Sequence, residues 1–211
     1  MENKMIKLII FDLDNTLFDT YNQLSKPVLG DMFQRMRAAG MTPEQEKALR
    51  ERYAYTGFKI LADQLGLNPD VVMVGMEAYE FMDMRHIKPY DDAKLLLELP
   101  GEKILVTSGI PKVQQEKVDL LGIRDYFEEV IIDDSSSPKN KEIIFERLMK
   151  EKSLKPGEVV VVGDNPDSEL IGAKNLGIVS VQILRHEGMR EGNYDHKIKG
   201  LAELKGIIAR Y

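Results

Sequence analysis

The stretch LIIFDLDNT, residues 8–16, sets a short apolar run directly before two acids. Residues 8–11 are apolar throughout and contain two Ile, which is typical of a strand buried on both faces of a parallel sheet. Asp12 and Asp14 follow at once, and open α/β sheets bind ligands outside the carboxyl ends of their strands. The stretch therefore predicts a buried strand that ends in a carboxylate site. A turn closed by a capping Asp is the competing interpretation, because Asp and Asn are common in turns.

Four further apolar runs of strand length, rich in Ile or Val, follow along the chain. They are residues 103–106, 130–132, 159–162 and 179–184. Helical patterns stand before or between these runs, and a closing amphipathic helix follows them: residues 90–99, 111–121, 141–152, 169–176 and 201–209. Strands that alternate with helices of this length predict βαβ units and an α/β fold with a doubly wound parallel sheet.

The stretch between the first two strands is far longer than one crossover and contains no convincing strand. Thr42-Pro43 and Asn68-Pro69 each place a capping residue before a Pro that suits the first turn of a helix. We therefore expect a helical domain at residues 20–86, inserted into a core domain formed by residues 1–19 and 87–211.

Composition narrows the possible partners. The chain has 211 residues, a formal net charge of -6 and no Cys. An acidic chain is a poor match for nucleic acid or an anionic membrane surface, and without Cys there is no thiolate catalysis and no Cys-ligated metal. No stretch approaches a membrane span. We expect a cytoplasmic monomer or homodimer in which an anionic substrate meets a local positive site.

Polar residues also follow the second and third strands. Thr107 and Ser108 place hydroxyl groups next to a helix start, which suits an anion, although plain loop or capping chemistry is the commoner use of such residues. Lys139 lies at the start of a helix, where a cation is unfavourable unless it pairs with a bound anion. Taken singly, Lys139 and Lys141 are both interpreted as solvated surface lysines.

The fourth strand ends in Gly163-Asp164, and Glu169 follows within the same acidic segment. Oxygen ligands from separate strand ends match magnesium better than zinc. Asp164 leaves the strand first and is the natural ligand. A plain helix N-cap is the competing interpretation of this Gly-Asp pair.

In order, these signals resemble the four motifs of the haloacid dehalogenase superfamily of phosphohydrolases. The matching residues are Asp12, Asp14 and Thr16 for the first motif, Thr107 for the second, Lys139 for the third, and Gly163-Asp164 with Glu169 for the fourth. Two positions depart from the usual pattern, since Asn140 replaces a common Pro and Glu169 replaces a usual Asp. The resemblance implies a Rossmann-like core with a helical, C1-type cap, and a phosphatase that acts on a small phosphorylated metabolite.

The resemblance also implies a role for each residue. Asp12 would attack phosphorus to form an aspartyl-phosphate, while Asp14 would protonate the leaving alcohol and then activate water. Mg²⁺ would be held by the carboxylates of Asp12 and Asp164 and by the backbone carbonyl of Asp14, with Glu169 in support or as a direct ligand. The substrate-binding set would be Thr16, which braces the loop, with Thr107, Ser108 and Lys139.

Other activities on the same scaffold stay open at this point. A haloacid dehalogenase would need no metal and no acid for its leaving group, so Asp14 favours phosphoryl transfer. A phosphomutase differs in cap residues that the sequence does not place. Phosphonate hydrolysis would need a cap lysine, for which Lys59 is the candidate, although lone helical lysines are mostly solvated. A non-catalytic module that binds a phosphorylated ligand is the alternative from another class.

Overall fold

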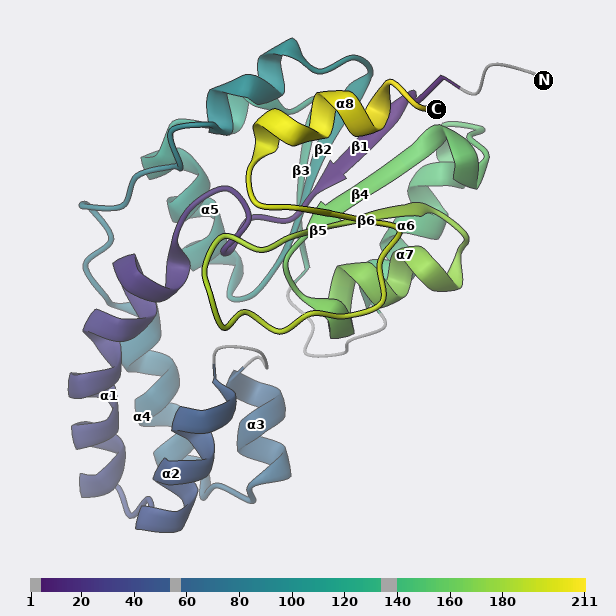
Figure 1. Cartoon of the computed structure of the whole chain (residues 1–211). Helices are drawn as coiled ribbons and strands as arrows, with labels where there is room; N and C mark the ends of the chain where they lie inside the picture. The colour runs from purple at the N-terminus through teal and green to yellow at the C-terminus, as the bar shows by residue number, and fades with distance from the viewer. Residues whose placement is uncertain (1–4, 54–57, 134–139) are drawn as a thin grey trace.

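The computed structural model describes residues 5–53, 58–133 and 140–211. Its centre is a parallel sheet of six strands in the order β3-β2-β1-β4-β5-β6, as Figure 1 shows. The strands are β1 (Leu8–Phe11), β2 (Glu102–Ser108), β3 (Glu129–Asp133), β4 (Val159–Gly163), β5 (Val179–Ile183) and β6 (His196–Ile198). The prediction of a doubly wound parallel sheet is confirmed, with β1 between β2 and β4 at its centre.

The edge strand β6 was not expected from the sequence. It has only three residues, and of these only Ile198 is buried. A strand this short and half exposed carries no apolar run, so the pattern that identifies the buried strands does not detect it.

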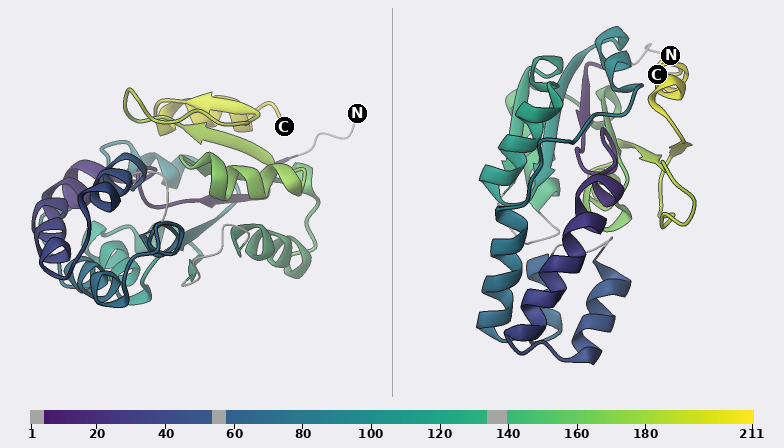
Figure 2. Two further views of the ribbon diagram at one scale, coloured as in Figure 1. Left: turned by 90° about the horizontal axis from the view of Figure 1, so that it is seen from below. Right: turned by 90° about the vertical axis from the view of Figure 1, so that its left-hand side faces the viewer.

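Helices cover both faces of the sheet. The apolar residues of β1 point alternately to its two sides, so both faces must be covered from water. Ile9 and Phe11 lie in one hydrophobic cluster with α5 (Pro111–Leu121) and α8 (Leu204–Ile208). Leu8 and Ile10 lie in a second cluster with α6 (Asn140–Glu151) and α7 (Ile171–Asn175). Figure 2 shows the sheet between these layers.

Three predicted helices differ in type or bounds from the sequence-based expectation. Residues 93–98 form a 3₁₀ helix, η2 (Ala93–Glu98), in place of the helix expected at 90–99. The helix after β4 begins as a π-helical segment, η5 (Pro166–Leu170), and the closing helix begins as a 3₁₀ turn, η6 (Leu201–Glu203). Two further 3₁₀ turns are η3 (Arg124–Tyr126) and η4 (Pro156–Glu158). Across residues 5–53, 58–133 and 140–211, no helix combines the length and the apolar character that crossing a membrane requires.

Between β1 and β2 the chain forms helices. They are η1 (Tyr21–Ser25), α1 (Lys26–Ala38), α2 (Pro43–Arg52), α3 (Phe58–Gln64) and α4 (Pro69–Glu80). Thr42 caps α2 with a full capping box and Asn68 caps α4, as their sequence signatures predict. These helices enclose a hydrophobic cluster of their own, around Phe33 and Leu61. Figures 1 and 2 show the bundle beyond the sheet edge toward which β1 points.

The two connections between the sheet and the bundle run side by side. Phe18 forms an isolated β-bridge with Pro89, and the backbone N–H of Tyr90 donates to the carbonyl of Leu17 over 2.9 Å. The side chain of Gln23 also accepts from the backbone N–H of Lys88 over 2.7 Å. The chain therefore leaves the core and returns to it through one narrow, hydrogen-bonded connection.

Two glycines of the bundle should respond oppositely to Ala. A Cβ on Gly30, exposed in α1, meets nothing within 4 Å, so Gly30→Ala should stabilise the fold by about 0.5–1 kcal/mol. A Cβ on Gly75 in α4 would lie 2.5 Å from Cζ of Phe58, so Gly75→Ala should cost about 1–3 kcal/mol through overpacking. Urea unfolding of the two variants measures the difference, and shifts of the same sign would contradict this packing.

Candidate active site

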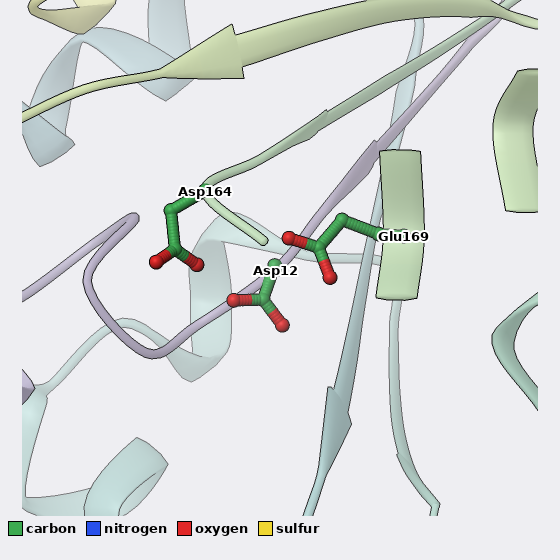
Figure 3. Close-up of side chains that lie close together, drawn as sticks. All are labelled: Asp12, Asp164 and Glu169. Atoms are coloured by element: carbon green, nitrogen blue, oxygen red, sulfur yellow. The ribbon is translucent and has the colours of Figure 1, made fainter. Parts of the chain in front are cut away.

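Three acids from two neighbouring strand ends converge in the structure. Asp12 follows β1, Asp164 follows β4, and Glu169 lies one helical turn farther on in η5. One carboxylate oxygen from each of them lies within 4.8 Å of the other two. Figure 3 shows the three carboxylates turned toward one another. Asp12 and Glu169 are buried, and Asp164 is half-buried.

The carboxylate of Glu169 is held in place through both of its oxygens. Oε1 accepts from the backbone N–H of Asn165 over 2.6 Å, and Oε2 accepts from Nζ of Lys141 over 3.0 Å. A Cβ at Gly163 would lie only 2.4 Å from Cγ of Glu169, so the glycine leaves the space in which this acid packs. The Gly163-Asp164 pair thus serves two purposes, since it supplies one acid and makes room for another.

Lys141 is a site residue that the sequence interpretation missed. It is 4% exposed, and its Nζ lies 2.5 Å from Oδ1 of Asp12, so the interpretation as a solvated surface lysine is wrong. It lies in the first turn of α6, on the same helical face as the buried Phe145 and Leu148. That i, i+4, i+7 spacing is the signal that could have found it. Lys139, the predicted lysine of the third motif, lies outside the described residues.

Burial and crowding of the acids dominate the electrostatics of this cluster. Burial raises the pKa of Asp12 to about 7, with Glu169 and Asp14 adding to the rise and the Lys141 ammonium opposing it. Burial and the neighbouring Glu169 and Asp12 raise the pKa of Asp164 well above its ordinary value. Burial opposes the charge on Lys141, but Asp12 and Glu169 hold the pKa of its ammonium above the ordinary value. Three acids thus share one contacting lysine within the described part of the chain, which favours a bound cation.

Asp14 has separate surroundings from Asp12. Its Oδ1 accepts from Oγ1 of Thr20 and from Nζ of Lys117, both over 2.7 Å, and its Oδ2 accepts from Nε2 of Gln114 over 2.9 Å. Burial opposes its charge, but Lys117, Gln114 and Thr20 together hold the pKa of Asp14 below its ordinary value. No sequence motif pointed to Gln114 or Lys117, which lie inside the helix expected at 111–121.

The remaining predicted site residues fall at or near the same sheet edge. Thr107 is fully buried, and its Oγ1 accepts from Nε2 of Gln114 over 2.5 Å. Ser108 is exposed and donates to Oδ2 of Asp133 over 3.2 Å. Thr16 is fully buried with a hydroxyl that has no partner among the described residues, while its carbonyl accepts from Nη2 of Arg185 over 2.8 Å.

Replacing Lys141 should destabilise the fold strongly. Lys141→Met leaves Asp12 and Glu169 without their ammonium partner, and breaking a buried ion pair costs about 3–5 kcal/mol. Lys152→Met is the matched control, because its ion pair with Glu102 is partly exposed and should be worth about 1 kcal/mol or less. Urea unfolding in EDTA measures both variants. Equal losses would contradict the placement of Lys141.

Comparison with known proteins gives a consistent result. A family model described as haloacid dehalogenase-like hydrolase matches residues 6–177. The glyceraldehyde 3-phosphate phosphatase of Methanopyrus kandleri is 31% identical over an alignment 213 positions long, gaps included, which covers 90% of each chain. The phosphoglycolate phosphatase of Vibrio vulnificus is 31% identical over an alignment 230 positions long, gaps included, which covers 99% of this chain and 98% of the relative. The crystal structure of a HAD phosphatase from Thermococcus onnurineus matches with a TM-score of 0.67 and 28% identity, covering 96% of this chain and 98% of that one.

Proposed function

The chain belongs to the haloacid dehalogenase-like hydrolase family, and we propose that it hydrolyses small phosphate monoesters at the site around Asp12. One observation carries the proposal: two acids only two residues apart have different surroundings. Asp12 lies among other carboxylates beside Lys141, while three hydrogen-bond donors surround Asp14. This division supports two distinct roles, one as nucleophile and one as acid and base. The relatives named for phosphatases of small metabolites support the same reaction.

The donor set at the strand ends fits Mg²⁺. It consists of carboxylate oxygens, which this hard cation prefers, and these acids are short of positive charge. The residues that would hold the ion are Asp12 and Asp164 through their carboxylates and Asp14 through its backbone carbonyl. Glu169 would support them, since both of its oxygens already accept hydrogen bonds. Bound there, Mg²⁺ supplies positive charge against the acids and the phosphoryl oxygens.

The chain's own residues would carry the two chemical steps. Asp12 attacks phosphorus and forms the aspartyl-phosphate while the bond to the leaving oxygen breaks. Asp14 gives its proton to that oxygen, so the product alcohol leaves neutral. In the second step Asp14 takes a proton from water as the water oxygen attacks phosphorus, which releases phosphate and restores the Asp12 carboxylate.

The groups that hold the phosphoryl oxygens are partly reassigned. Thr107 and Ser108 keep their proposed roles at the end of β2. The role predicted for Lys139 passes to Lys141, because the ammonium of Lys141 lies 2.5 Å from the carboxylate that attacks. A cation so placed would draw the substrate phosphate toward Asp12 and offset charge in the transition state.

Residues 20–86 would form a cap domain that selects the substrate. Helices α1–α4 have their own hydrophobic cluster and lie beyond the strand ends that carry the acids. The hydroxyl of Tyr79 in α4 lies 3.2 Å from Nζ of Lys117, so the bundle reaches the surroundings of Asp14. A small phosphorylated metabolite in the cytoplasm is the proposed substrate.

Asp12→Asn is the direct test of the nucleophile. With Mg²⁺ and p-nitrophenyl phosphate, turnover should fall by roughly 10³-fold or more, because an amide does not attack phosphorus. Asp125→Asn, an exposed acid in η3, is the control and should keep full activity. Phosphate release measures both variants, and undiminished turnover in Asp12→Asn would sink the mechanism.

Removal of the metal gives an independent test. EDTA should abolish turnover, and added Mg²⁺ should restore it, since the acids around Asp12 need a cation to bind an anionic ester. Full activity in EDTA would instead favour the dehalogenase type of chemistry on this scaffold.

A further inference from the structure

Lys117 is a buried cation that the proposed chemistry does not use. It lies inside α5 and is 1% exposed, and its Nζ is 2.7 Å from Oδ1 of Asp14. We propose that Lys117, together with Gln114, is a positioning residue that fixes the carboxylate of Asp14 for proton transfer to the leaving group. This inference rests on the proposed phosphatase function, because Asp14 is the acid of that reaction.

The contacts hold Asp14 from three sides. Lys117 and Thr20 donate to Oδ1, and Gln114 donates to Oδ2. A rotation of the carboxylate would break at least one of these hydrogen bonds. A carboxylate held at both oxygens keeps one orientation, which is what proton transfer at a fixed substrate atom requires.

Gln114 ties the same acid to the neighbouring strand. Its Nε2 also lies 2.5 Å from Oγ1 of Thr107 and 3.2 Å from the carbonyl oxygen of Ser108. The group that orients Asp14 is thereby anchored at the end of β2, where the proposed phosphate contacts lie. One side chain, that of Gln114, thus fixes the position of Asp14 relative to the proposed phosphate site.

The position of Lys117 on α5 indicates a functional role rather than a role in packing alone. Gln114 and Lys117 are three residues apart and each 1% exposed, so they share the buried face of the helix with Val113 and Val118. An apolar side chain would fill such a face without the desolvation that burying an ammonium costs. The exposed Lys112 on the same helix shows the usual placement of lysine.

Lys117 also touches the cap bundle and the connection that leads to it. Its Nζ lies 3.2 Å from the hydroxyl of Tyr79 and 5.7 Å from the ring centroid of Phe18. The ammonium therefore contacts the acid, the connection at Phe18 and helix α4 at one point. The orientation of Asp14 is linked to the placement of the bundle.

A purely structural role and a positioning role make different demands on the substrate. Loss of a structural ion pair would lower turnover of every ester alike. Loss of the orientation of Asp14 slows the first step mainly for esters whose leaving group needs a proton, whereas the second step, in which Asp14 takes a proton from water, is common to both esters. Phenyl phosphate and p-nitrophenyl phosphate have similar shapes, but phenolate is the poorer leaving group, so the pair separates the two roles.

The experiment compares Lys117→Met with the wild-type chain on both esters in the presence of Mg²⁺. The value of kcat/KM, which reports the first step alone, should fall by roughly 10²-fold for phenyl phosphate and by less than about tenfold for p-nitrophenyl phosphate. Lys112→Met is the matched control on the same helix, since it loses an exposed ion pair with Glu80 and a cation–π contact with the exposed ring of Phe81, and it should change turnover of neither ester. An equal fall in kcat/KM for both esters in Lys117→Met would overturn the inference.

Two further variants secure the interpretation. In an Asp14→Asn background, Lys117→Met should lower phenyl phosphate turnover by less than about twofold, because a residue that acts through Asp14 has nothing left to orient. An undiminished further loss there overturns the inference.

Gln114→Leu keeps Lys117 and should show a smaller selective loss, so it provides the same comparison if Lys117→Met does not fold. If Asp12→Asn stays active, the proposed function itself fails, whereas an inactive Asp12→Asn with an unselective Lys117→Met overturns only this inference.

Discussion

Repulsion among buried acids is the constraint on which the site depends. Asp12, Asp164 and Glu169 meet at the ends of β1 and β4, where burial makes each negative charge costly. Lys141 offsets part of that charge, and the first turn of α6 must enter the site to deliver it. Gly163 must lack a side chain so that Glu169 fits. The order of strands, the start of α6 and one glycine are all required by the same cluster of carboxylates.

The two acids of the first motif are each paired with a lysine, but their pKa values shift in opposite directions. The pKa of Asp12 is raised by burial and neighbouring acids despite Lys141, while Lys117 and its neighbours hold the pKa of Asp14 low. Bound ligands would reverse both pKa shifts. A cation beside Asp12 would lower its pKa and favour the ionised form, and a phosphate dianion beside Asp14 would raise its pKa and favour the protonated form. The arrangement thus suits a nucleophile that becomes ionised and an acid that becomes protonated when metal and ester are present.

The sheet could be predicted from the sequence because buried parallel strands are continuous apolar runs, and β1 has the predicted bounds. The acids could be predicted because they follow those runs. Lys141 could not be identified singly, since a lysine at a helix start is usually solvated, and only its spacing to Phe145 and Leu148 marks the buried face. Gln114 and Lys117 belong to no sequence motif. Their contacts with Asp14 arise only because α5 packs against the loop after β1. Packing of elements distant in sequence decides such residues.

The paired connection at Phe18 and Pro89 has a consequence for how such proteins diversify. The chain leaves the sheet and returns to it at one point, so the inserted bundle is a loop whose two ends lie together. Closing a longer or shorter loop changes the conformational entropy only slowly with length. One helical bundle can therefore be exchanged for another of different size or lining, with the strand ends and their acids left in place. Under the proposed role of the bundle as a cap, such an exchange would change the substrate range and leave the reacting residues at the strand ends unchanged.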